Sequence, residues 1–135
     1  AKKLGFEIEQ FGVDALKEKQ KHLQEFSDRT GSFVFQPDIE EKEAALQGFE
    51  HAKKIIKSGN FDLVIMDEIN CVLAKGLVPI EDVLELVRNH GKVELIFTGR
   101  DAPKELIEAA DYVNVVQGIK HPWQKGIVAR KGIEY

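Results

Sequence analysis

Two short apolar runs lie in the middle of the chain and predict its central strands. Residues 62–66 include four consecutive apolar side chains, and residues 93–98 have a similar composition. A continuous apolar run indicates a strand covered on both faces, as in a parallel sheet. Residues 79–88 separate the two runs and place apolar side chains at helical spacing, namely Ile80, Val83, Leu84 and Val87. The pattern therefore predicts a strand–helix–strand unit, whose two strands run parallel.

The alternation of helix and strand patterns extends to both sides of this unit. Upstream, residues 39–58 predict a helix that ends at Gly59, and residues 6–11 alternate apolar and polar positions as a strand with one polar face does. Downstream, a short helix is predicted to open at Asp101 and Pro103, and residues 112–116 predict another strand. These elements indicate an α/β fold with a mostly parallel sheet flanked by helices.

Length and composition place this fold in a single domain. The chain has 135 residues, 43% hydrophobic and 31% charged, which is typical of a globular protein. A formal charge of −4 argues against a nucleic-acid-binding surface, and no apolar run approaches the roughly 20 residues that cross a bilayer. The single cysteine, Cys71, excludes an internal disulfide and fits a reducing compartment. We therefore expect one domain over residues 1–135 in a cytoplasmic protein without nucleic-acid or membrane partners.

Two polar clusters follow the two central strands directly. Asp67-Glu68-Ile69-Asn70 comes after the first strand, and Thr98-Gly99-Arg100-Asp101 comes after the second. If the strands are parallel, both clusters lie at the sheet edge where α/β proteins bind ligands. An apolar strand that ends in Asp-Glu resembles the Walker B element, in which the acid holds Mg²⁺ directly or through water.

Each candidate in these clusters also has a simpler interpretation. Asp67 could cap a following turn while Glu68 is solvated. Arg100 could bind phosphate in bidentate fashion, or it could form a surface ion pair with Asp101 or Glu105. The pair Thr98-Gly99 could be the turn by which the chain leaves the sheet. Cys71 has no histidine nearby in the sequence and is predicted to pack on a helix.

A third candidate is the aromatic stretch at residues 31–37, which places Phe33 and Phe35 among turn-forming residues. These rings could form a lip over a flat apolar ligand, or they could belong to a short strand that packs into the core. A conventional phosphate loop, Gly-x-x-x-x-Gly-Lys-Ser/Thr, does not occur in the 135 residues. The one Gly-Lys pair, Gly91-Lys92, closes a predicted helix and leads into a strand, which is the wrong polarity for such a loop.

Four stretches of the sequence resemble motifs of a known family and follow one another in the same order as in that family. They are residues 61–70, 77–84, 97–111 and 120–135. Together they resemble the corrinoid adenosyltransferases, which act on cob(I)alamin or cob(I)yrinic acid a,c-diamide. The resemblance implies a P-loop nucleotide hydrolase (RecA-like) fold, a homodimer, and transfer of the 5′-deoxyadenosyl group of ATP to the reduced cobalt of a corrinoid. It implies Mg²⁺ or Mn²⁺ as the metal and a flavoprotein as a reductant partner.

The resemblance also assigns roles to individual residues. Asp67 and Glu68 match the acidic pair at the metal–nucleotide site, and Thr98 and Arg100 match the nucleotide-binding segment on the same edge. Phe33 and Phe35 match a segment that faces the corrinoid.

The family's phosphate loop precedes the matching region, and residues 1–5 are predicted to end a helix. We therefore expect an N-terminally incomplete domain that lacks the first strand and the phosphate loop. The alternative is a non-catalytic relative that has lost this loop and binds a corrinoid or a partner.

Overall fold

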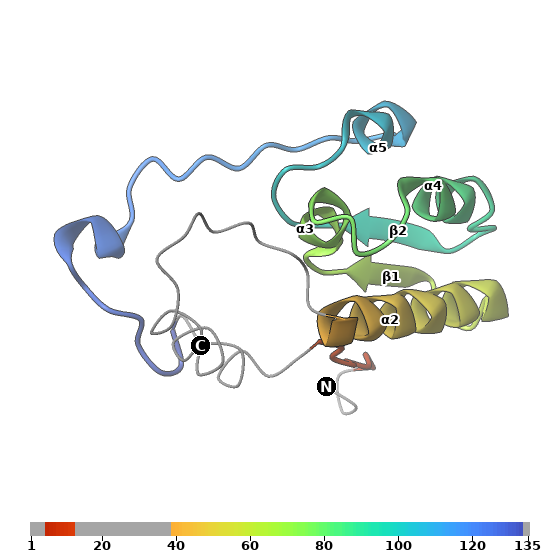
Figure 1. Cartoon of the computed structure of the whole chain (residues 1–135), viewed down its shortest axis with the longest axis horizontal. Coiled ribbons are helices and arrows are strands. Elements are labelled where there is room, and N and C mark those ends of the chain that lie inside the picture. The colour runs from red at the N-terminus through yellow and green to blue at the C-terminus, as the bar shows by residue number, and fades with distance from the viewer. Residues whose placement is uncertain (1–4, 13–38, 134–135) are drawn as a thin grey trace.

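The computed structural model describes residues 5–12 and 39–133 and shows helices packed against a small parallel sheet (Figure 1). The elements follow one another as α2 (Ile39–Ser58), β1 (Leu63–Met66), α3 (Ile69–Ala74), α4 (Ile80–Arg88), β2 (Glu94–Phe97), α5 (Lys104–Ala109) and the 3₁₀ helix η2 (Pro122–Lys125). The predicted helix over residues 39–58 is confirmed at both ends. The helix α3 was not predicted.

The sheet consists of β1 and β2, which pair in parallel. Their register places Leu63 opposite Glu94 and Met66 opposite Phe97. The chain crosses from β1 to β2 through α3 and α4, so the predicted strand–helix–strand unit is confirmed. Parallel pairing brings the carboxyl ends of both strands to one edge, where the two polar clusters begin.

One face of this sheet packs on the core, and the opposite face is open in the described part of the chain. Val64 and Met66 of β1 pack against the buried cluster, whereas Ile65 between them is 57% exposed. The prediction that both faces are covered is therefore wrong for the described residues. The cause is the placement of the helices, because the buried cluster that contacts one face of the strands includes residues from α2, α3, α4 and α5.

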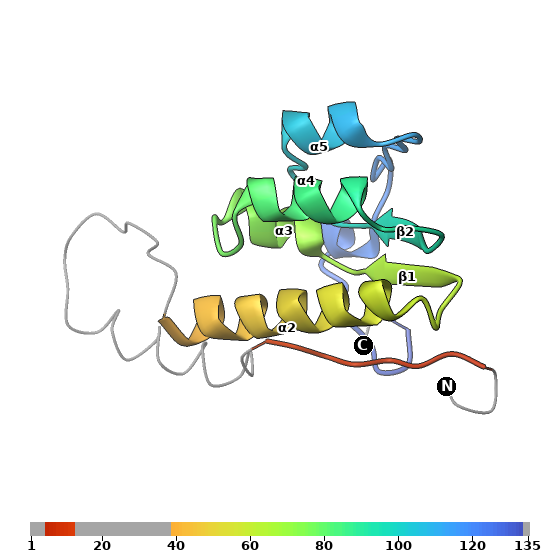
Figure 2. The same cartoon turned by 90° about the vertical axis from the view of Figure 1, so that its right-hand side faces the viewer.

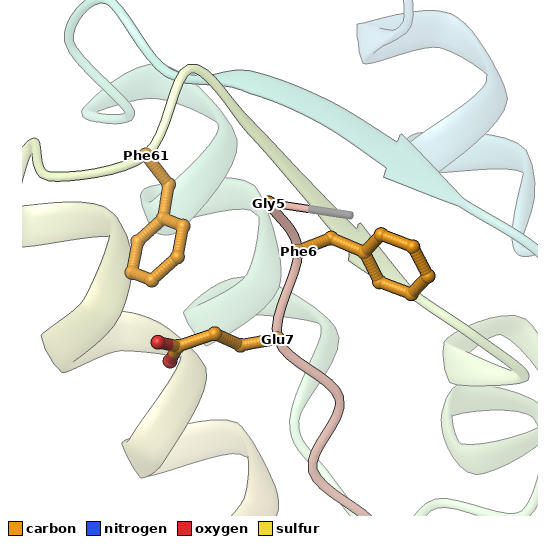
Figure 3. Close-up of a pocket in the computed structure, with 4 residues that line it drawn as sticks. All are labelled: Gly5, Phe6, Glu7 and Phe61. Carbon is orange, nitrogen blue, oxygen red and sulfur yellow. The ribbon is translucent and has the colours of Figure 1, made fainter. Parts of the chain in front are cut away.

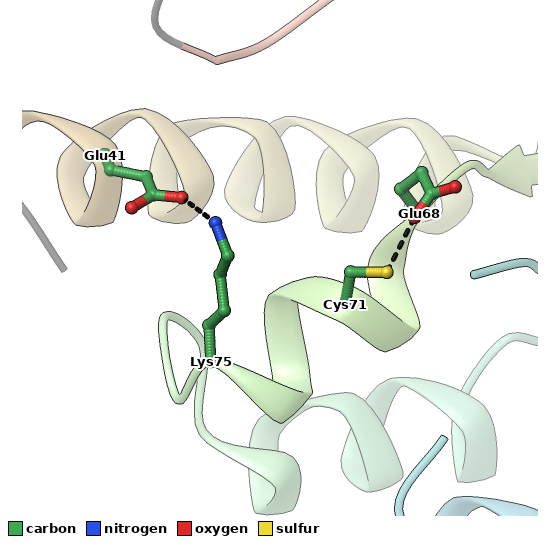
Figure 4. Close-up of polar contacts among 4 residues, drawn as sticks. All are labelled: Glu41, Glu68, Cys71 and Lys75. Atoms are coloured by element: carbon green, nitrogen blue, oxygen red, sulfur yellow. Dashed lines mark hydrogen bonds and ion pairs between the residues drawn. The ribbon is translucent and has the colours of Figure 1, made fainter. Parts of the chain in front are cut away.

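In the part of the chain that the structure describes, most buried apolar side chains form one cluster between these helices and the sheet. Val83 of α4 is fully buried, with 0% of its surface exposed. The other buried members are Phe49, Ile56, Ile69, Leu73, Val78, Leu86, Val93 and Leu106. An ion pair between Glu41 on α2 and Lys75 after α3 joins the two helices near the surface (Figure 4).

Two predicted strands are not strands in the structure. Residues 5–12 run extended beside α2 (Figure 2), where the ring of Phe11 lies against Gly48 and Glu9 pairs with His51 at 3.0 Å. Residues 112–116 form no strand either, and Val116 is 95% exposed. The physical reason is the same for both segments. An alternating or β-branched sequence becomes a strand only beside a partner strand, and neither segment pairs with β1 or β2.

Several predictions lie outside the described residues. They concern the charged segment 14–29 and the aromatic residues Phe33 and Phe35. Among the residues that the structure describes, no helix combines the length and the apolar character that crossing a membrane requires.

Candidate functional site

The candidate site lies at the sheet edge where β1 and β2 end. The Thr98 hydroxyl, just after β2, donates a hydrogen bond to Asp67 Oδ1, just after β1. The Thr98 hydroxyl oxygen also accepts a hydrogen bond from the Glu68 backbone N–H, at 3.0 Å. The Thr98 carbonyl accepts the Asn70 N–H at 3.1 Å. The expected convergence of the two polar clusters is therefore confirmed, and Thr98 is the residue that joins them.

The turn between β1 and α3 has an unusual backbone at Glu68. This residue has φ 60° and ψ 15°, in the left-handed region that non-glycine side chains seldom adopt. Glu68 occupies the N-cap position of α3, yet no side chain caps this helix. Asp67 is thus not a helix cap, because its carboxylate bonds to Thr98 instead. Strained residues of this kind cluster at ligand sites and switch regions.

Cys71 fastens the side chain of Glu68. Its thiol donates a hydrogen bond to Glu68 Oε2 at 2.6 Å (Figure 4), and its sulfur accepts the Arg100 backbone N–H at 3.3 Å. Cys71 is itself a residue of α3, a helix that was not predicted, and it is partly exposed. The Glu68 side chain is therefore exposed, but its carboxylate is fixed by a hydrogen bond and is not simply solvated. The sequence did not predict this contact, because it depends on α3, which follows Glu68 directly.

Gly99 allows the two clusters to approach each other closely. Its φ is +122°, and a Cβ atom on it would lie 3.1 Å from the Cβ of Asn70. The same atom would lie 3.2 Å from the backbone nitrogen of Cys71 and 3.2 Å from the Cα of Glu68. Because two of these three neighbours are backbone atoms, they cannot turn aside as the end of a side chain could. A side chain at this position would therefore be strained, both by these contacts and by the positive φ.

Replacing Gly99 by alanine is expected to push the Thr98–Arg100 segment away from the Asp67–Glu68 turn. We expect the free energy of unfolding to fall by about 1–3 kcal/mol, the usual cost of a strained backbone residue. Urea denaturation measures this change. The matched control is Gly118→Ala, where a Cβ would meet nothing within 4 Å and φ is not in the left-handed region. Equal stability of the two variants would contradict the close approach at Gly99.

The charges at this edge suit a metal bound to phosphate. Asp67 and Glu68 are both exposed, and the described residues include no group of three or more His, Cys, Asp or Glu that could hold a metal ion. Mg²⁺ commonly takes one or two carboxylates and completes its shell with phosphate oxygens and water. The two carboxylates therefore fit a metal that arrives with a phosphate ligand, and they do not form a metal cage of protein ligands alone.

Arg100 lies in the segment after β2, where its backbone N–H donates a hydrogen bond to Cys71 Sγ at 3.3 Å. Arg100 is an exposed residue. The ion pairs of the described residues do not include one between Arg100 and Asp101 or Glu105, which was an alternative interpretation of the sequence. A guanidinium can bind a phosphate in bidentate fashion. The structure thus joins Asp67, Glu68 and Thr98 by hydrogen bonds and ties the Arg100 backbone to this edge through Cys71, while Phe33 and Phe35 lie outside its described part.

A separate pocket of about 300 Å³ lies at the other end of β1. It is lined by Gly5, Phe6, Glu7 and Phe61 (Figure 3). The side chains of Phe61 and Glu7 lie on one side of the 5–7 segment, and the ring of Phe6 points to the other. Because Phe61 precedes β1 and Asp67 follows it, this pocket is not part of the polar edge.

Comparison with known proteins finds one family model and several related proteins that all point to the same family. The model of the family described as ATP:corrinoid adenosyltransferase BtuR/CobO/CobP matches residues 2–135. A corrinoid adenosyltransferase of Sinorhizobium sp is 33% identical over 93 residues, which is 67% of this chain and 44% of the relative. That of Escherichia coli K12 is 28% identical over 120 residues, 86% of this chain and 61% of the relative. That of Pseudomonas aeruginosa is 34% identical over 101 residues, 74% of this chain and 48% of the relative.

Proposed function

The chain belongs to the ATP:corrinoid adenosyltransferase family, and on that premise we propose that it acts in the transfer of the 5′-deoxyadenosyl group of ATP to the reduced cobalt of a corrinoid. The observation that supports this function best is the meeting of Asp67, Glu68 and Thr98 at one sheet edge. The proposal concerns the whole reaction, whereas the chain spans 44–61% of the length of the three relatives described above.

Each group at the edge has a task in this proposal. Asp67 and Glu68 would hold Mg²⁺ or Mn²⁺, which would supply positive charge for the triphosphate group. Thr98 orients Asp67, and Arg100 binds a phosphate oxygen. In the reaction itself, the cobalt(I) electron pair forms a bond to C5′ of ATP, and the C5′–O bond breaks with its electrons on the triphosphate. Fixing the triphosphate keeps C5′ aligned for this attack.

Binding of the corrinoid is assigned to residues that do not belong to this sheet edge. We propose that Phe33 and Phe35 contact the corrinoid, which is cob(I)alamin or cob(I)yrinic acid a,c-diamide. The homodimer, the flavoprotein reductant and the cytoplasmic location expected from the sequence belong to the same proposal.

A second candidate function is favoured by one feature of the sequence. The 135 residues contain no Gly-x-x-x-x-Gly-Lys-Ser/Thr motif, so they include no conventional cradle for a triphosphate. A non-catalytic relative would bind a corrinoid or a partner protein without needing this cradle. Binding of the corrinoid would then be independent of ATP.

One experiment separates the two functions. The protein is mixed with ATP, Mg²⁺ and a chemically reduced corrinoid, and the absorbance spectrum is followed before and after illumination. A transferase forms a cobalt–carbon bond, so we expect a product that light destroys. Corrinoid binding without this product, and with an affinity that ATP does not change, would establish the non-catalytic function instead.

A further inference from the structure

The side chain of Asn70 is buried at the polar edge without a hydrogen bond for its oxygen. Asn70 is the one polar residue that the described part of the chain buries, with 8% of its surface exposed. Its Oδ1 atom has no hydrogen-bond partner among the described residues. Most buried side-chain polar atoms in proteins do have a partner, and an acceptor without a donor is unfavourable. The presence of an amide at this buried position therefore needs an explanation.

The surroundings of Asn70 indicate which group could satisfy this oxygen. Asn70 contacts the segment after β2 twice, through its N–H to the Thr98 carbonyl at 3.1 Å and through its Cβ beside Gly99. The Thr98 hydroxyl already donates to Asp67, and the Cys71 thiol donates to Glu68. The Gly99 N–H is a donor on this facing segment, and it makes no backbone hydrogen bond among the described residues.

We propose that Asn70 is a positioning residue that holds the Thr98–Arg100 segment against the Asp67–Glu68 turn. A rotation of its amide group pairs Oδ1 with the Gly99 N–H, which satisfies both groups at once. This contact fixes the separation between the carboxylates on one side and Arg100 on the other. Its value for catalysis rests on the proposed function, because a metal–phosphate ligand must span these two sides.

The test compares two variants of Asn70 that have nearly its size. Asn70→Leu removes the acceptor and keeps the bulk, whereas Asn70→Asp keeps an acceptor oxygen. Amide hydrogen exchange of Gly99, measured by NMR at neutral pH without ligand, reports the contact directly. We expect exchange roughly threefold to tenfold faster in Asn70→Leu, as for the loss of one hydrogen bond, and near-native exchange in Asn70→Asp. An exposed control, Asn114→Leu, should leave Gly99 unchanged.

Stability and ligand binding complete the test. If Oδ1 pairs with the Gly99 N–H as proposed, Asn70→Leu leaves this N–H without its acceptor, so the variant should melt below the natural protein. Its affinity for Mn²⁺·ATP should fall as well. Equal exchange of Gly99 in the natural protein and in Asn70→Leu would overturn the proposal. If the exchange pattern is as expected but the natural protein binds no nucleotide, the positioning contact stands and the proposed function fails.

Discussion

Val83→Asp is expected to unfold the domain. Val83 lies on α4 at the centre of the core and has 0% of its surface exposed. Burying a carboxylate there without a partner costs about 4 kcal/mol or more. A domain of this size is stable by only about 5–15 kcal/mol, so the loss is a large part of the total. We expect the far-ultraviolet circular dichroism signal of the helices to collapse at a much lower urea concentration.

The matched control is Val116→Asp, which makes the same chemical change at a site that is 95% exposed. Surface substitutions of this kind usually change stability by no more than about 0.5 kcal/mol. The two variants thus differ in burial and not in chemistry. If Val116→Asp destabilises the protein as strongly as Val83→Asp does, residues 112–116 are covered in solution and the described arrangement of this segment is wrong.

Glu68→Ala is expected to abolish adenosyl transfer while the fold remains intact. The change removes one of two candidate metal ligands and the acceptor of the Cys71 thiol. Loss of residues that merely support a metal ligand costs about 10–100-fold, so losing a ligand itself should cost at least about 100-fold. The measurement is the rate at which the light-sensitive corrinoid product forms, with ATP and Mg²⁺ in excess.

Glu105→Ala serves as the control for this prediction. It removes an exposed carboxylate on α5 that no ion pair of the described residues uses. Its transfer rate and melting temperature should match those of the natural protein. Native transfer by Glu68→Ala would show that Glu68 does not hold the metal, and a lowered melting temperature would show that it supports the fold instead.

Periodicity predicted those parts of the fold that local sequence determines. The helix over residues 39–58 and the strand–helix–strand unit were predictable, because their apolar spacing is regular and their ends have turn residues. The segments 6–11 and 112–116 have equally good strand patterns, yet neither is a strand. A strand depends on a partner that its own sequence does not specify. The prediction that helices cover both faces of the sheet was also wrong for the described residues. Whether a face is covered depends on which other elements pack against it, and the sequence of the strand does not specify this.

The candidate site was predictable in position but not in its contacts. Two polar clusters after two parallel strands must meet at one edge, so the proximity of Asp67 and Thr98 follows from topology alone. The bond from Cys71 to Glu68 could not be predicted without α3, a helix too short for a clear periodic signal. Asn70 was missed as well, because its burial depends on how closely Gly99 approaches.

The central claim is that Asp67, Glu68, Thr98 and Arg100 form one metal–nucleotide site. Paramagnetic Mn²⁺ tests it most directly, because the ion broadens the NMR signals of the amides nearest to it. With Mn²⁺·ATP added, we expect broadening at residues 67–71 and 98–101, and its loss in Glu68→Ala. Broadening centred on another acidic stretch, such as Glu40 and Glu41 at the start of α2, or unchanged broadening in Glu68→Ala, would contradict the account.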